Sequence, residues 1–193
     1  MLFRSVTINV LGSNGELFVE TFGGYQGNQN SKQADTDLNV AHGGKVPGWT
    51  HSGQGAIHAV DRSFKGGTVT PSDWAIMIFE DNVITSDAID ANKAGVGYEV
   101  SFQAGPAVYA QRFQASQASD SLSVEVLRKD GTRLKMFQHA SGAWNGRAEF
   151  RAAHFEYQGD GSGAIRLRIG PAGNKADGRF RGAIDNIVVR ERK

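Results

Sequence analysis

The amino-acid sequence predicts an all-β protein, a jelly-roll β-sandwich built from two antiparallel sheets. Many short apolar runs are separated by Gly, Asn, Asp and Ser, which is the pattern of short strands joined by turns. Glycine is abundant, at 25 residues, and proline is scarce, at 4. No long segment repeats its apolar residues with the period of a helix. These observations indicate about nine to eleven strands, and stacking two sheets is the natural way to bury so many.

The strand signals are strongest in the middle and at the end of the chain. Trp74 to Phe79 is an uninterrupted apolar run, which suits a strand covered on both faces. Residues 98–102 alternate apolar and polar side chains, and so do residues 165–169, where two arginines form a basic outer face. A last strand spans residues 183–190. We therefore expect these four segments to supply much of the core.

The segment 121–139 predicts a β-hairpin. Asp130-Gly131 lies at its middle, and this pair suits positive φ in a two-residue hairpin loop. Arg133 and Lys135 should face outward. The predicted buried face is formed by Leu122, Val124, Val126, Leu134 and Met136.

Two segments carry no clear strand signal. Residues 23–44 are polar and rich in Asn, Gln and Gly, so a long loop is expected there. Residues 106–120 predict either a short helix or a loop, with Gln111, Gln114 and Gln117 separated by Ala and Ser. Loops of this length in a compact domain are often functional.

Length and charge set the broad class. The 193 residues suit one all-β domain, so we expect a single β-sandwich domain over residues 1–193, with residues 1–13 a poorly ordered or non-native start. The net charge of +1 gives no support to nucleic-acid binding. No apolar run approaches the roughly 18 residues of a membrane span. The absence of cysteine excludes disulfides and cysteine-based zinc sites.

The start of the chain carries no signal-peptide pattern, since Met1 to Val10 lacks a long apolar core followed by small residues. Residues 2–5, Leu-Phe-Arg-Ser, are also what a common sequencing adapter would encode. We therefore expect a metagenomic gene cut at its edge, so that the chain is part of a larger protein.

Two carboxylates fall on apolar parity in predicted strands. Asp185 shares its parity with Ile187 and Val189, and Glu20 lies between Phe18 and Phe22. A carboxylate on an apolar face is costly unless it is paired or binds a metal. Calcium takes carboxylate and carbonyl oxygens, so one interpretation is a structural Ca²⁺ shared by the two residues. The alternatives are a hydrogen bond to nearby backbone or arginine, or a bulged strand.

Three segments carry a family resemblance: Val46-Pro47-Gly48-Trp49, the run from Gly97 to Gly105, and the run from Gly182 to Val189. They resemble the galactose-binding-like jelly rolls of bacterial carbohydrate-binding modules and related secreted cell-wall proteins. The resemblance spans roughly residues 14–190 and implies a fold more than an activity. It also implies that the protein is secreted or extracellular. It further implies a structural calcium between the first strand and the last-strand aspartate. The first strand of the family usually carries an Asn-Gly-x-Phe-Glu pattern, whereas here extra residues separate Asn14-Gly15 from Phe18 and Glu20.

Sugar sites pair aromatic platforms with polar side chains. Trp49, Tyr109 and Trp144 are the candidates for binding a saccharide, because each lies in a predicted turn or next to a loop. Trp74 opens an apolar strand and is a weaker candidate. For all of them the alternative is a packed aromatic without contact to ligand.

Three functions follow from these observations. The first is a non-catalytic carbohydrate-binding domain that recognises a polysaccharide or oligosaccharide through loop aromatics. The second is a calcium-dependent enzyme on the same jelly roll, either a small-molecule cyclase or a glycan lyase. The third is an adhesion domain without a small ligand. Fold alone does not choose among them, and no catalytic constellation stands out, so binding is the preferred hypothesis.

Overall fold

The computed structural model describes residues 15–22, 35–37, 48–52, 58–61, 74–107, 116–143, 149–173 and 179–193. These residues form strands and no helix. None of them forms a segment able to cross a membrane as a helix. The strands are β1 (Glu16–Glu20), β2 (Asp35–Asp37), β3 (Trp49–Ser52), β4 (His58–Asp61), β5 (Trp74–Phe79), β6 (Val83–Ser86), β7 (Gly97–Gly105), β8 (Ser121–Leu127), β9 (Arg133–Ala140), β10 (Arg151–Gln158), β11 (Arg166–Pro171) and β12 (Phe180–Glu191).

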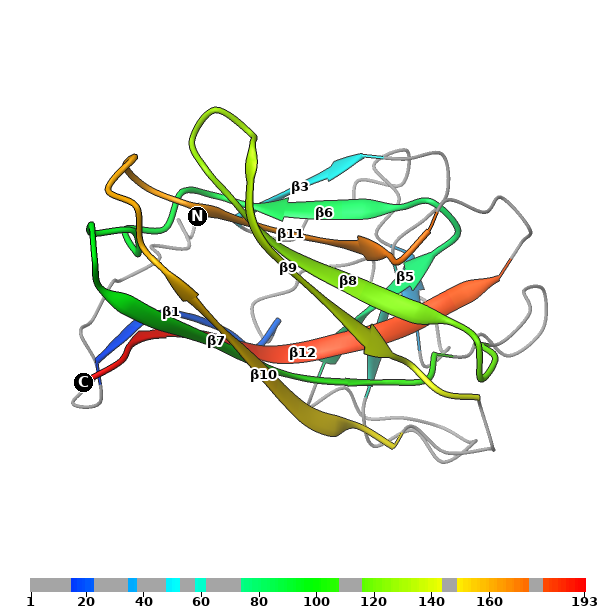
Figure 1. The fold of residues 1–193 in the computed structure, drawn as a ribbon. Coiled ribbons are helices and arrows are strands. Elements are labelled where there is room, and N and C mark those ends of the chain that lie inside the picture. The colour runs from blue at the N-terminus through cyan, green and yellow to red at the C-terminus, as the bar shows by residue number, and fades with distance from the viewer. Residues whose placement is uncertain are drawn as a thin grey trace, which may run out of the picture.

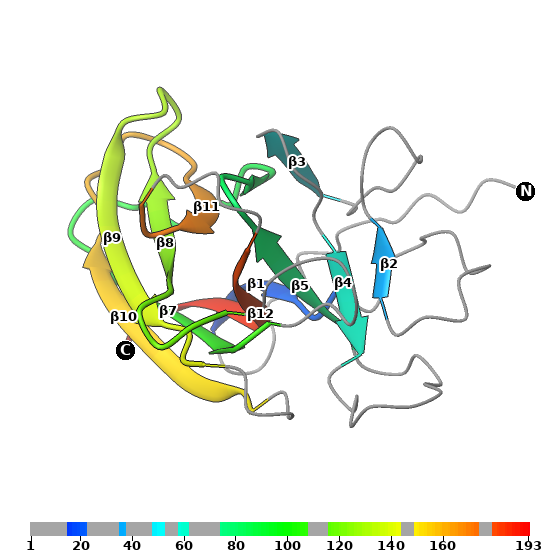
Figure 2. The same ribbon diagram turned by 90° about the vertical axis from the view of Figure 1, so that its right-hand side faces the viewer.

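The strands form two antiparallel sheets, as predicted. The larger sheet has the order β10-β7-β12-β5-β4-β2, and β1 pairs with the second half of β12. The smaller sheet has the order β3-β6-β11-β8-β9. The two layers lie one above the other in Figure 1. Figure 2 shows β9 and β10 at one side of the sandwich and β2 and β4 at the other. The jelly-roll sandwich predicted from the sequence is confirmed.

The main core fills the space between the sheets. Alternate residues of β7 and β11 point into it, which confirms the predicted strands over 98–102 and 165–169. β5 is covered on both faces, also as predicted, because alternate residues belong to the main core and to a smaller apolar cluster. The largest fully buried side chains are Tyr98, Phe22, Phe102, Ile76, Met77, Ile78, Ile84, Leu122, Ile165 and Leu167.

The hairpin over 121–139 is confirmed, but its turn and its second strand differ from the prediction. Arg128 and Thr132 pair across the turn, and Gly131 alone of the predicted pair takes positive φ, at 85°. This is a longer turn closed by a glycine bulge. The ladder shifts register between Val126 and Leu127, which displaces the alternation of β9. Met136 is therefore 37% exposed, and the prediction that it lies on the buried face is wrong.

The predicted long loop over residues 23–44 is interrupted by β2, which pairs with β4 through Asp35 to Asp37. Its other residues lie outside the described part of the chain, as do residues 108–115 of the predicted helix or loop. The sequence missed β2 because three polar residues carry no apolar alternation.

Asp160 ties three separate turns together at one end of the sandwich. Its backbone N–H donates to Asn92 Oδ1, and its Oδ1 accepts from Asn92 Nδ2, both at 2.9 Å. Arg128, in the turn after β8, donates from Nε to Asp160 Oδ2 at 2.6 Å. The hydrogen bond from Arg128, followed by those from Ser162, lowers the pKa of Asp160 well below its ordinary value. These hydrogen bonds therefore stabilise the charged form of the carboxylate over the protonated form.

We call the hydrogen bonds of Asp160 with Asn92, Arg128 and Ser162 the Asp160 clasp, and we predict that it makes the stability of the fold depend on pH in the acid range. Because the pKa of Asp160 is lower in the folded chain, its contribution is complete above the ordinary value near 3.8 and is lost as the pH falls below it. Asp160→Asn should therefore lower the Tm at pH 7, and the difference from wild type should shrink as the pH falls from about 4 toward 2. Thermal melts across this range measure it. Asp90→Asn, at an exposed position, is the control; a difference independent of pH would contradict the clasp.

Candidate functional site

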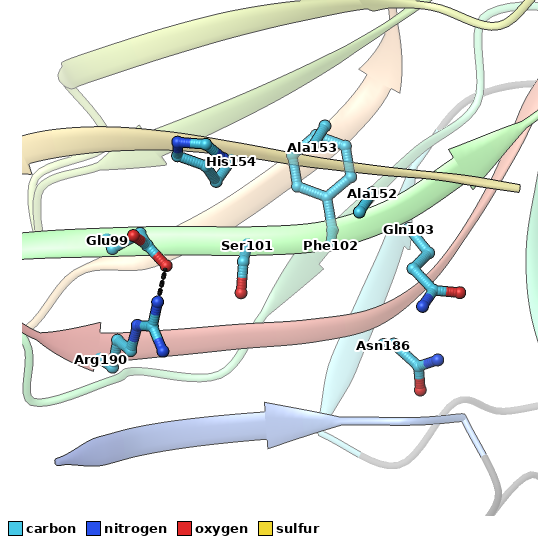
Figure 3. A pocket seen from close by; sticks show the side chains of 9 residues that line it. All are labelled: Glu99, Ser101, Phe102, Gln103, Ala152, Ala153, His154, Asn186 and Arg190. Atoms are coloured by element: carbon cyan, nitrogen blue, oxygen red, sulfur yellow. Dashed lines mark ion pairs between the residues drawn. The ribbon is translucent and has the colours of Figure 1, made fainter. Parts of the chain in front are cut away.

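An open groove crosses the outer face of the larger sheet over β10, β7 and β12 (Figure 3). Its volume is about 370 Å³. Tyr98, Val100 and Phe102 point into the main core, so the residues between them along β7 point outward. We call this feature the β7 groove; it is lined by Glu99, Ser101, Phe102, Gln103, Ala152, Ala153, His154, Asn186 and Arg190.

Strand pairing places the polar side chains of the β7 groove in cross-strand rows. Ser101 lies opposite His154 on β10, and Gln103 lies opposite Ala152. On the other side of β7, Arg190 of β12 lies opposite Glu99. Directly opposed residues in antiparallel strands have Cβ atoms about 5 Å apart, so these side chains form one continuous polar surface.

An ion pair orders one end of the β7 groove. Arg190 Nη2 lies 2.6 Å from Glu99 Oε1, and the side chains are 47% and 15% exposed. A charge-assisted bond of this kind fixes the guanidinium while leaving its other N–H groups available. Figure 3 shows the pair at one end of the groove and Gln103 with Asn186 toward the other.

Asn186 enters the β7 groove because β12 is irregular there. The pairing of β12 with β7 shifts register between Asp185 and Val188, and Asn186 adopts a positive φ of 50°. Asparagine tolerates this conformation better than most residues. A bulge of this kind turns a side chain to a new direction. The local sequence Asp-Asn offered a signal for it, but simple alternation did not identify it.

The lining of the β7 groove is suited to hydrogen bonding. It offers hydroxyl, amide, imidazole, carboxylate and guanidinium groups, which include both donors and acceptors. Phe102 is the one aromatic hydrocarbon ring among the lining residues, and it is only 2% exposed. The described residues of this groove therefore offer a ligand polar contacts and almost no exposed aromatic surface.

Trp49, a predicted ligand contact, packs between the sheets at the start of β3. Its ring centroid lies 6.1 Å from that of Phe18 and 5.9 Å from that of Phe22. Its Nε1–H donates to Glu20 Oε2 at 2.9 Å, while Phe22 N donates to Glu20 Oε1 at 2.6 Å. This arrangement is the packed-aromatic alternative considered for Trp49. It also shows Glu20 acting as a hydrogen-bond acceptor for protein groups.

The predicted calcium ligands Glu20 and Asp185 are not brought together. Glu20 lies opposite Ile187, with its carboxylate directed to Trp49 of the other sheet. Asp185 is fully buried and lies opposite Gln103 on β7. Ile184 belongs to the main core and Ala183 to the smaller cluster, so alternation places Asp185 on the outer side of the sheet.

The bulge after Asp185 therefore breaks the parity with Ile187 that suggested a shared ion. The described residues contain no group of three or more His, Asp or Glu side chains that could hold a metal. The pair does not fit a common calcium site in this arrangement, and calcium stays an untested prediction.

The remaining candidates, Tyr109 and Trp144, lie outside the described residues, and so does the side chain of Trp74. The structure therefore does not place them relative to the β7 groove. Their contact with a ligand stays a prediction from the sequence.

A second hollow, of about 220 Å³, lies near the ends of β7 and β9. Its lining includes His139, Ser141, Glu149 and Arg151. Burial lowers the pKa of His139 below its ordinary value of 6.5; a hydrogen bond with the Ala104 backbone opposes this effect, and the charge of Arg151 adds to it. The imidazole is therefore neutral at pH 7.

The two roles considered for Glu20 differ in their response to calcium. Glu20→Ala removes the acceptor of the Trp49 and Phe22 N–H groups, and hydrogen bonds to charged groups are worth about 1.5–3 kcal/mol each. We expect the Tm to fall by about 5–10 °C, equally in calcium and in a strong chelator. Thermal melts in both buffers, with Glu16→Ala as the control on the same strand, measure this. A loss seen only with calcium would instead support the calcium site.

No protein-family model matches the chain, and no curated protein matches its sequence. Its structure is similar to that of TmCBM61 in complex with β-1,4-galactotriose, with a TM-score of 0.50 and 15% identity over 76% of this chain and 90% of that one. It is similar to the K1 adhesin domain of Lys-gingipain from Porphyromonas gingivalis, with a TM-score of 0.50 and 10% identity over 91% and 98% of the two chains.

A third similar structure is the arabinose-bound MgGH51 α-L-arabinofuranosidase, with a TM-score of 0.50 and 14% identity. The match covers 95% of this chain but 28% of that enzyme. At such low identities the likeness concerns the fold. It confirms that this chain has the jelly-roll fold of carbohydrate-binding modules, as the resemblance in the sequence implied.

Proposed function

We propose that this protein is a non-catalytic carbohydrate-binding domain that holds a saccharide along the β7 groove. The observation that carries the proposal is the row of polar side chains from three adjacent strands, lining an open hollow of about 370 Å³. Saccharides present many hydroxyl groups that both donate and accept hydrogen bonds. A surface that mixes amide, hydroxyl, imidazole and ion-paired groups complements them.

The charges of the β7 groove favour a neutral saccharide. Its carboxylate, Glu99, and its guanidinium, Arg190, neutralise one another at 2.6 Å. A sugar diol can donate to the carboxylate and accept from the guanidinium without breaking the pair, because both groups keep unused hydrogen-bonding positions. Because Arg190 is already paired with Glu99, an acidic sugar gains no net electrostatic attraction from this pair.

The open shape of the β7 groove supports binding over catalysis. An enzyme needs a positioned acid or base in a site that excludes water. Here the groove lies across a sheet face, and Glu99 is engaged by Arg190. The fold occurs both in the galactotriose-bound TmCBM61 and within the arabinose-bound arabinofuranosidase, so the fold itself leaves the choice to the site.

Gln103→Ala should weaken binding to neutral oligosaccharides roughly threefold to tenfold, because the loss of one hydrogen bond is worth about 0.5–1.5 kcal/mol. The Tm of Gln103→Ala is measured alongside, so that an effect on ligand binding is separated from an effect on stability. Binding is measured by calorimetry with the oligosaccharide that a glycan array of neutral and acidic sugars selects. Gln138→Ala, at an exposed position on β9 of the other sheet, is the matched control. Equal affinity of both variants and wild type would exclude the β7 groove.

Stacking by loop aromatics is a separate part of the proposal. If Tyr109 or Trp144 supplies a platform, Trp144→Ala or Tyr109→Ala should weaken saccharide binding by about tenfold without unfolding the protein, since ring contacts contribute about 0.5–1.5 kcal/mol beyond area burial. The same titrations, with circular dichroism as the folding check, measure this. Unchanged affinity in both variants would leave recognition to hydrogen bonds alone.

A further inference from the structure

We propose that the outer face of the smaller sheet is a second binding surface, which takes an acidic polysaccharide. The surface is formed by Arg166 and Arg168 of β11, Arg133 of β9, and Glu125 of β8 between them, and we call it the arginine face. It is separate from the β7 groove, which lies on the other sheet.

The arginine face points away from the core because of strand alternation. Leu167 and Ile169 are fully buried in the main core, so Arg166 and Arg168 project outward between them. On β8, Val124 and Val126 are likewise buried in the main core, which places Glu125 between them on the outer side. Since neighbouring strands lie about 4.8 Å apart, the arginines of β11 and β9 flank Glu125 across roughly 10 Å.

Glu125 holds two of the arginines in place. Its carboxylate is almost buried, with 7% of the side chain exposed. Arg168 Nη2 lies 2.8 Å from Oε2, and Arg133 Nη1 lies 3.4 Å from Oε1. The two arginine side chains keep 48% and 54% of their surface exposed. Arg133 Nη1 also contacts Met136 Sδ at 3.3 Å, which further limits its movement.

The arginine face carries more positive than negative charge. One carboxylate serves two guanidiniums, and Arg166 is exposed without an ion pair to any residue in the described part of the chain. A guanidinium that is already oriented loses less side-chain entropy when it binds a carboxylate or sulfate. The chain as a whole has a net charge of only +1, so the positive charge is concentrated locally.

The chemistry of the arginine face favours an acidic polysaccharide over a nucleic acid. Planar guanidiniums bind carboxylate and sulfate groups in a bidentate manner. Proteins that bind single-stranded nucleic acid add aromatic rings on which bases stack. The four residues that define the arginine face include no aromatic ring, and the side chains of Ser123 and Met136, which contact Glu125 and Arg133, are not aromatic either.

The test is affinity electrophoresis of the purified protein in gels that contain polygalacturonate, dextran sulfate or neutral dextran. The two acidic polymers separate carboxylate from sulfate recognition, and dextran measures retardation without charge. We expect retardation by at least one acidic polymer, with Kd rising as salt is added. Arg166→Gln and Arg168→Gln should each raise Kd roughly threefold to tenfold, the effect of one basic residue near an anionic surface.

Lys193→Gln is the matched control, because it removes one exposed positive charge after β12 of the other sheet. Its Kd should stay within about twofold of wild type. Arg166→Gln is the decisive variant, since it breaks no ion pair, and an unchanged Tm confirms its fold. The proposal is overturned if no acidic polymer retards the protein more than dextran, if Lys193→Gln acts like Arg166→Gln, or if DNA binds more tightly with the same dependence on Arg166. Gln103→Ala should not affect acidic-polymer binding, so this result and the neutral-sugar result are independent.

Discussion

The pairing of β12 with three other strands is the constraint on which the rest of the larger sheet depends. Its first half pairs with β5, its second half pairs with β1, and β7 runs along its other side. A strand in this position has its backbone groups satisfied on both edges, so its register fixes that of its neighbours. Gly182 permits the close approach of β12 to the smaller sheet. Its φ is 153°, and a side chain there would overlap Ser141 and Leu122.

The irregularity of β12 links this constraint to the β7 groove. In a regular strand Ile184 and Ile187, three residues apart, would point to opposite faces of the sheet. Here both side chains belong to the main core. The extra residue is absorbed at Asp185 and Asn186, where the ladder with β7 shifts. The same shift lets Val189 stay in the core and Arg190 stay outside, opposite Glu99. Core packing on one side of the sheet thus sets the polar surface on the other.

Regular alternation made much of the fold predictable. Leu167 and Ile169 were placed in the core from their spacing alone, and the hairpin followed from Val124, Val126 and the glycine at its turn. The errors occurred where pairing with another strand changed the period. Met136 is exposed because the β8–β9 ladder shifts, and no signal in its own segment shows that shift.

The candidate site was less predictable than the core, for a physical reason. Ser101 and Gln103 are ordinary polar residues on the outer side of an amphipathic strand, and a solvated face would have the same pattern. Their significance comes from the neighbours of β7, which are β10 and β12, and those strands are distant in sequence. Trp49 shows the opposite case. Its residue type suggested a ligand contact, but its ring and its N–H group are occupied by Phe18, Phe22 and Glu20.

The two carboxylates Glu20 and Glu125 show how the same chemical problem receives different solutions in the two sheets. Each is placed in a strand where its desolvation must be offset. Glu20 accepts hydrogen bonds from the backbone N–H of Phe22, after β1, and from the indole N–H of Trp49 in β3, so its charge is compensated inside the protein. Glu125 is offset by two guanidiniums, so its burial leaves positive charge at the surface. The type of hydrogen-bond partner therefore decides whether charge remains at the surface. Backbone and indole donors compensate a carboxylate inside the protein, whereas arginines keep part of their guanidinium groups exposed to a ligand.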